Sequence, residues 1–173
     1  MQIFVSRDLT TLINNGKREL FILNLSKKSV RNFIWLAFIV YLLVVCILCF
    51  APTLPLVIPE SNPVPYIYVG NAPFIYLPFV ETLHLDFYLN ILITFPFGIF
   101  IALLKKHPLS VGNVLCSGLA LGLFIEIMQL VLDNLKLTSR WIDINDVLAN
   151  AVGLCLGYWL MSWLLAKIIK YAK

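Results

Sequence analysis

Apolar residues form four long runs along the chain, separated by shorter polar or irregular segments. The runs cover residues 33–51, 87–104, 111–132 and 147–169. Each run is close to the roughly 20 residues that an α-helix needs to cross the hydrocarbon core of a bilayer. The pattern predicts an all-α, polytopic membrane protein, in which residues 32–170 form four transmembrane helices packed as a small bundle.

The composition points to the same class of protein. Hydrophobic residues make up 61% of the chain and charged residues 13%, and the mean hydropathy is +0.91. An ordinary soluble domain has roughly 45–50% apolar and about 25% charged residues. These values exclude a soluble enzyme, a disordered tail and a disulfide-stapled secreted domain. The four cysteines all fall within predicted spans, where packing is the expected role.

The positive charges are distributed unevenly about the predicted spans. Eleven of the 13 lysines and arginines precede the first run, lie at the C-terminal end from Lys167 onward, or lie in the gap after the second run, and the remaining two are Lys136 and Arg140. Cytoplasmic segments of membrane proteins carry an excess of lysine and arginine. We therefore expect cytoplasmic N- and C-termini, with segments 52–86 and 133–146 facing outward. The net charge of +4 then reflects orientation in the membrane and not nucleic-acid binding.

Residues 1–31 form a separate basic segment ahead of the first span. Apolar residues are mixed with cations throughout this segment. Two interpretations stay open at this point. The segment is either an amphipathic helix lying on the anionic inner leaflet or a partly ordered cytoplasmic leader.

The outer segment 52–86 is rich in proline and aromatic residues. It holds seven of the nine prolines and no lysine or arginine. Prolines at this density do not allow a regular helix, and tyrosine favours the membrane interface. We expect an aromatic flap along the head groups. The alternative is a re-entrant segment, which would need other helices to bury its backbone.

Polar side chains within the predicted spans gather near their outer ends. Glu126 is the clearest case, because a charged residue in a membrane helix is costly. It would lie roughly 9 Å below the outer end of the third span, at 1.5 Å per residue. Asn90 and Asn150 lie near the outer ends of the second and fourth spans. For these asparagines the alternative is interhelical hydrogen bonding that only holds the bundle together.

Two helical faces would join this polar layer. At about 100° per residue, Gly118, Gly122, Glu126 and Gln129 share one face of the third span. A helix that already begins near Arg140 would place a second set on one face of the fourth span: Asp143, Asp146, Asn150, Gly153 and Gly157. Both sets contain a pair of glycines four residues apart, which lets helix backbones approach closely. We expect one tight seam between the third and fourth spans.

The polar layer contains the groups that a head-group site needs. Arg140 can bind phosphate through two parallel hydrogen bonds. Together with Arg140, the candidate catalytic residues are Glu126, Asp143 and Asp146, whose carboxylates could carry out acid–base chemistry. Arg140 is also a candidate substrate-binding residue, with Asn90, Gln129 and Asn150. The short Asp143-x-x-Asp146 spacing is weak support for a divalent metal, so no metal is assigned and the cofactor stays unknown.

The spacing of these residues resembles the core signature of VanZ-like membrane proteins. The similar stretch is Glu126-x-x-Gln129, followed by Arg140-x-x-Asp143-x-x-Asp146-x-x-x-Asn150-x-x-Gly153-x-x-x-Gly157. Asn90 with Pro96-Phe97-Gly98 is similar to the family's Asn…Pro-x-Gly stretch. The resemblance covers roughly residues 71–160, about half of the chain, and does not extend to residues 1–30.

The resemblance implies a multi-pass protein in the cell membrane of a Gram-positive-type bacterium. The family's namesake gives resistance to teicoplanin-type glycopeptides, and relatives have been suggested to modify lipid head groups or lipid-linked wall precursors. The implied partners are membrane lipids, lipid-linked wall precursors and lipoglycopeptide antibiotics. Three functions stay open: a head-group transferase or hydrolase, a non-catalytic binder that shields precursors or excludes lipoglycopeptides, and a transporter. The transporter ranks last, because four spans contain no second inverted set.

Overall fold

The computed structural model describes residues 27–52, 64–80, 82, 84–105 and 107–171. The described chain is mostly helical, and each of its four helices is long and apolar enough to cross a membrane. The helices are α2 (Lys28–Phe50), α3 (Leu85–Leu104), α4 (Val111–Asn134) and α5 (Ile144–Tyr171). The prediction of a helical protein with four spans is confirmed. Residues 1–26 of the basic N-terminal segment lie outside the described residues.

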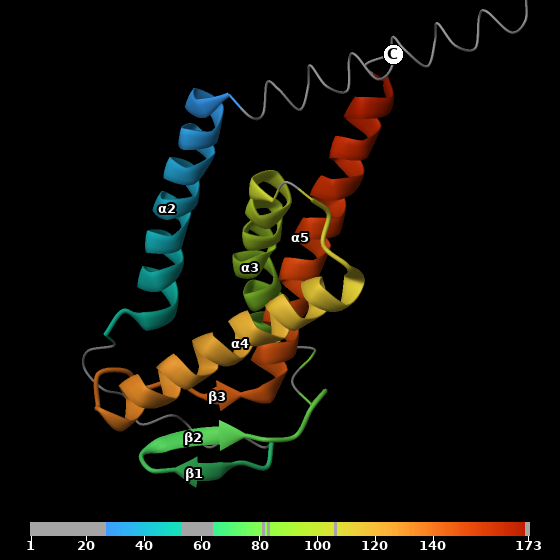
Figure 1. The fold of residues 1–173 in the computed structure, drawn as a ribbon. Coiled ribbons are helices and arrows are strands. Elements are labelled where there is room, and N and C mark those ends of the chain that lie inside the picture. The colour runs from blue at the N-terminus through green and yellow to red at the C-terminus, as the bar shows by residue number, and fades with distance from the viewer. Residues whose placement is uncertain (1–26, 53–63, 81, 83, 106, 172–173) are drawn as a thin grey trace, which may run out of the picture.

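The outer segment forms part of a small sheet that the sequence analysis did not predict. Strand β1 (Ile67–Val69) pairs antiparallel with β2 (Ala72–Ile75), and β2 pairs in parallel with β3 (Ile142–Asp143). Figure 1 shows the sheet at one end of the bundle, beside the start of α5. Residues 64–80 contain no helix, as the prolines predicted. Three of the seven prolines of segment 52–86 lie in residues 53–63, which are outside the described part.

The β1–β2 hairpin is fixed to the end of α4. Gly70 occupies the first central position of the two-residue turn with φ 68°, which glycine adopts without strain. The side chain of Asn134, the last residue of α4, accepts a hydrogen bond from the Asn71 N–H at 2.9 Å. It also donates to the Val69 carbonyl at 3.1 Å. The hairpin is therefore placed against α4 by specific polar contacts.

One side chain and a sharp backbone turn set the ends of α4. The Ser110 hydroxyl accepts a hydrogen bond from the backbone three residues later, as an N-cap residue does. At the other end Lys136 takes a left-handed backbone, with φ 58°. Its N–H bonds to the Asp133 carbonyl, and the Leu137 N–H bonds to the Leu132 carbonyl. This Schellman motif ends the helix and turns the chain back towards β3.

The tightest packing in the bundle joins α5 to two different helices. Val147 and Ala151 of α5 face α4, where a Cβ added at Gly122 or Gly118 would lie 2.9 Å from their Cα atoms. Gly153 and Gly157 instead face the backbone of α3. A small apolar core lies where the three helices meet, and consists of Val114, Leu154, Cys155 and Tyr158.

The expected single glycine seam between the third and fourth spans is therefore wrong. At 100° per residue, positions 153 and 157 are rotated by about 120° from positions 147 and 151 around α5. The two glycine pairs consequently serve two interfaces: Gly118 and Gly122 join α4 to α5, and the other pair joins α3 to α5. The condition for placing Asp143 on that face, a helix that begins near Arg140, is not met, because Asp143 lies in β3 and α5 begins at Ile144.

Helix α2 touches the rest of the bundle at few places. The rings of Phe38 and Tyr41 pack on those of Phe97 and Phe100 in α3, with centroids 5.1–6.4 Å apart. Within α2 only Cys49 is buried. Most of this apolar helix is thus free to face lipid, and its C-terminal end reaches the region of the polar residues.

The orientation of the bundle in the membrane stays a prediction from the charges. The start of α2 and the end of α5 lie at the same end of the bundle, opposite the sheet (Figure 1). We expect reporter fusions after Lys173 and near Lys105 to be cytoplasmic, and a fusion near Lys136 to be external. Paired reporters that are active on opposite sides of the membrane measure this directly. An external C-terminus would contradict the placement of the polar residues at the outer face.

Candidate functional site

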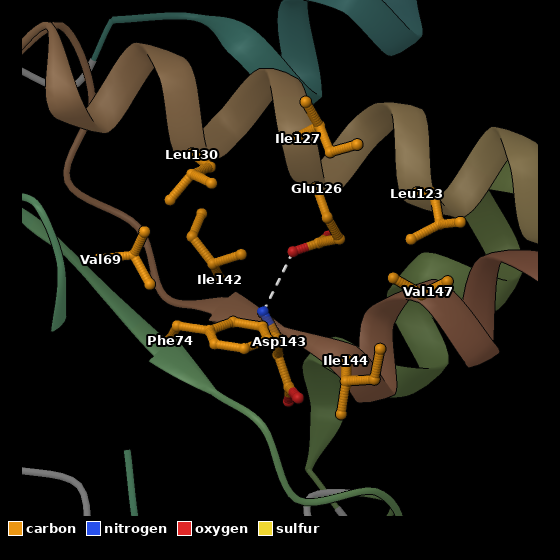
Figure 2. Close-up of a pocket in the computed structure, with 10 residues that line it drawn as sticks. All are labelled: Val69, Phe74, Leu123, Glu126, Ile127, Leu130, Ile142, Asp143, Ile144 and Val147. Atoms are coloured by element: carbon orange, nitrogen blue, oxygen red, sulfur yellow. Dashed lines mark hydrogen bonds between the residues drawn. The ribbon is translucent and has the colours of Figure 1, made fainter. Parts of the chain in front are cut away.

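A cavity of about 210 Å³ lies between α4 and the sheet. Two acidic residues, Glu126 and Asp143, line it among apolar side chains (Figure 2). The apolar lining residues are Val69, Phe74, Leu123, Ile127, Leu130, Ile142, Ile144 and Val147. The surface of the cavity is apolar, and the Glu126 carboxyl group is buried beside it.

Glu126 is the acidic side chain that extends from α4 across the cavity. Helix α4 runs obliquely across α5, which places its second half over the sheet (Figure 1). Figure 2 shows the Glu126 carboxylate directed at β3, where Oε2 accepts a hydrogen bond from the Asp143 N–H at 3.1 Å. Glu126 is only 5% exposed. The strand backbone thus fixes the position of a carboxyl group that is otherwise surrounded by apolar side chains.

The carboxylate of Asp143 has a different position. It points away from Glu126 in Figure 2, and its Oδ1 accepts hydrogen bonds from the backbone and side-chain nitrogens of Asn145, at 2.8 and 2.7 Å. An acidic residue just before a helix that accepts from the second helical N–H is an N-cap. Asp143 therefore fixes the first turn of α5.

The charges of the candidate catalytic residues influence one another. Asp146, Asp143 and Arg140 all lie within electrostatic range of Glu126. Asp146 is half-buried in the first turn of α5. The structure thus brings together three carboxylates and one arginine, from α4, β3, α5 and the loop between α4 and β3.

Arg140 is held at its backbone and at its side chain. Its N–H donates to Oδ2 of Asp133 at 2.9 Å, and the other oxygen of that carboxylate accepts from the Thr138 hydroxyl. Its Nη2 donates to the Leu48 carbonyl of α2 at 3.0 Å. Its Nε is buried and has no hydrogen-bond partner among the described residues. The guanidinium therefore uses one side of its fork on α2.

The other three candidate substrate-binding residues lie at helix contacts. Gln129 donates through Nε2 to the Cys49 carbonyl at 3.3 Å. Thr94 links the two asparagines, since its hydroxyl donates to the main-chain carbonyls of Asn90 and Asn150 at 2.8 and 2.9 Å. Asn150 is 1% exposed, and its side-chain amide has no partner in the described chain. None of the three lines the cavity next to Glu126.

Two important residues were missed by sequence reasoning. Asn145 is fully buried; it donates to the Leu77 carbonyl at 3.0 Å and accepts from the Phe79 N–H. It therefore ties the segment after β2 to the start of α5. Asp133, which holds the backbone of Arg140, lies two helical turns after Glu126 and so on the same face of α4. That spacing could have identified it.

The described residues offer little for a metal ion. They contain no group of three or more histidine, cysteine, aspartate or glutamate residues placed to hold one. The oxygen of Asp143 that faces Asn145 is already occupied by two hydrogen bonds. The hypothesis of a metal at Asp143 and Asp146 therefore gains no support, and the cofactor stays unknown.

Comparison with known proteins gives one match. The model of the VanZ/LLP1 family matches residues 38–166, which includes all four helices in part or in full, the sheet and every candidate site residue. No curated protein and no solved structure matches the chain. The family resemblance carried by the polar signature is confirmed.

Proposed function

Because the chain belongs to the VanZ/LLP1 family, we propose that it acts at the outer leaflet on the head group of a membrane lipid or lipid-linked wall precursor. The result would be resistance to teicoplanin-type glycopeptides in the cell membrane of a Gram-positive-type bacterium. The reaction would be transfer or hydrolysis of the head group. In this proposal Glu126 exchanges a proton, Arg140 binds phosphate, and Asp146 orients the reacting groups.

The observation that carries this proposal is the environment of Glu126. A carboxyl group buried beside an apolar cavity is costly, and among the described residues the hydrogen bond that Glu126 accepts comes from a strand N–H, that of Asp143. An apolar cavity suits the apolar part of a lipid, and the buried carboxyl group lies beside it. Arg140 is one of the charged residues whose field reaches Glu126, so a phosphate-binding cation lies in the same region of the protein.

A non-catalytic binder is the second candidate, and a specific observation favours it. Arg140 and Gln129 donate to carbonyls of α2, and Asp143 caps α5. These residues therefore have structural partners in addition to any ligand. A protein that shields precursors or excludes lipoglycopeptides would need the same pocket without proton exchange.

The experiment that tests the proposal is mass spectrometry of membrane lipids and wall precursors from cells with and without the protein. A lipid or precursor that appears or disappears with the wild-type protein, and not with Glu126→Gln, supports the enzyme. The matched control is Asp86→Asn, which removes an exposed carboxylate at the start of α3 and should leave the change intact. Unchanged pools together with full resistance would reject the enzyme in favour of the binder.

A further inference from the structure

The C-terminal end of α2 is held by two side chains that come from other elements. Nη2 of Arg140 donates to the Leu48 carbonyl at 3.0 Å, and Nε2 of Gln129 donates to the Cys49 carbonyl at 3.3 Å. The last carbonyls of a helix lack partners within the helix and carry the negative end of its dipole. Two donors from separate elements thus converge on two neighbouring oxygen atoms of partial negative charge.

In this arrangement only part of the Arg140 guanidinium is hydrogen-bonded. Its Nε is buried without a partner in the described part of the chain. Buried donors of this kind are rare, because losing the hydrogen bonds that water would supply costs free energy. A guanidinium fork is shaped for two oxygens of a single phosphate or carboxylate, whereas the Leu48 carbonyl offers one. The empty side of the fork indicates a partner with more oxygen atoms.

The backbone position of Arg140 does not depend on α2. The Asp133 carboxylate binds the main-chain N–H of Arg140 at 2.9 Å and also accepts from the Thr138 hydroxyl. These contacts fix the loop before β3 to the end of α4. If the end of α2 moved away, the backbone of Arg140 would stay in place.

The rest of α2 allows its C-terminal end to move. Its other contacts with the bundle include the aromatic cluster of Phe38 and Tyr41 on α3, together with a hydrogen bond from the Tyr41 hydroxyl to the Ile93 carbonyl at 2.6 Å. These contacts lie near the middle of the helix, so they can serve as a pivot. Near the end, Cys49 is the single buried residue of α2.

We propose that Arg140 and Gln129 form an oxyanion site that the end of α2 occupies when no ligand is bound. Phosphate oxygens would replace the carbonyls of Leu48 and Cys49, giving Nε and Nη2 of Arg140 two oxygens of one group and Nε2 of Gln129 a third. The ligand is a phosphate-bearing compound, and binding releases the last turn of α2. The assignment to a lipid head group rests on the proposed function, whereas the phosphate chemistry does not.

The thiol of Cys49 can report this release, because it is only 5% exposed while α2 is held. The reporter protein is the full chain with Cys46, Cys116 and Cys155 replaced by alanine, purified in a maltoside detergent that contains no phosphate. The rate of maleimide addition to Cys49 is measured with dodecyl phosphate, with dodecanol and with inorganic phosphate. We expect dodecyl phosphate to raise the rate about tenfold or more, as loss of hydrogen bonds from a charged group implies. Dodecanol should have no effect.

The two phosphate sources give different results. A response to dodecyl phosphate alone supports the site and assigns it to a membrane-anchored head group. An equal response to inorganic phosphate supports the site and rejects the lipid assignment. No response to either, in protein that melts normally, would overturn the proposal and leave Arg140 as a structural cap on α2.

Substitutions of Arg140 separate a binding fork from a simple cap. Arg140→Gln should make Cys49 react rapidly without ligand and remove the response to dodecyl phosphate. Arg140→Lys keeps one donor for Leu48, so Cys49 should stay protected while the response falls about tenfold, because the fork is lost. The matched control is Lys136→Gln, which removes the other cation of the same loop and should change neither rate.

The lysine variant keeps the test decisive if the glutamine variant fails to fold. A wild-type response to phosphate in Arg140→Lys would contradict the fork. The thiol measurement requires neither turnover nor antibiotic resistance, so its outcome is independent of the lipid analysis. A changed lipid pool with an unresponsive Cys49 would reject this inference alone, and the reverse result would reject only the catalytic function.

Discussion

Glu126→Gln is expected to lower the activity by about 10²–10⁴-fold while the protein still folds and inserts, because that range is typical for loss of a general acid or base. Glutamine keeps the length of the side chain and an oxygen that can accept the Asp143 N–H, the hydrogen bond that fixes Glu126 in the cavity. It removes only the proton that a carboxyl group can exchange. A neutral amide also costs less to bury than a carboxylate, so the substitution should not destabilise the folded protein.

The measurement is glycopeptide resistance at matched membrane abundance, followed by lipid turnover once a changed species is identified. Asp86→Asn is the control, because it removes an exposed carboxylate at the start of α3, outside the cavity. Its activity should match the wild type. Full activity in Glu126→Gln would remove the acid–base role and leave the binder as the function of the same pocket.

The sequence identified Glu126 because the membrane environment makes a charge stand out. Four apolar runs and one internal carboxylate can be recognised without knowing how the helices pack, since the bilayer imposes length and polarity on each span separately. Asp143 could have been assigned better. Asp143 lies four residues ahead of the apolar run 147–169, and aspartate is a preferred N-cap residue, so the sequence also allowed a place ahead of α5 and not on its face.

The sheet and the contacts of Arg140 could not be predicted in the same way. Strands of two to four residues carry too little alternation to be recognised, and β2 meets β3 only because the chain turns sharply after α4. The contact between Arg140 and Leu48 depends on where α2 ends relative to a loop far along the chain. Periodicity reports the face of a single helix and says nothing about which neighbour that face meets.

This distinction has a direct consequence for the glycines. Gly122→Leu and Gly153→Leu are both expected to abolish or strongly reduce folded protein in detergent. A Cβ added at Gly122 would lie 2.6 Å from the Val147 carbonyl oxygen, and one at Gly153 would meet the Ile91 carbonyl and the Thr94 hydroxyl. Backbone cannot move aside as a flexible side chain can, so the helices must separate. Even overpacking by smaller groups typically costs about 1–3 kcal/mol.

Gly112→Leu is the matched control, because an added Cβ at Gly112 has nothing within 4 Å. This exposed position lies in the first turn of α4, where leucine favours the helix over glycine by roughly 0.5–1 kcal/mol. Leucine should therefore stabilise the protein at Gly112 and unfold it at Gly122 or Gly153. The melting temperature and the yield of folded protein are measured for all three variants. Normal melting of Gly122→Leu or Gly153→Leu would contradict the close approach of the backbones.

Alanine variants can then decide whether there are two interfaces or one seam. Gly122 joins α4 to α5, whereas Gly153 joins α3 to α5, and the two contacts share no partner residue. Effects on the free energy of unfolding at independent sites add to within about 0.3–0.5 kcal/mol, whereas residues in a shared interface couple. We expect Gly122→Ala and Gly153→Ala to be additive in the double variant. A double variant clearly less destabilised than the sum would mean that separating one pair of helices already relieves the other, as a single seam between α4 and α5 requires.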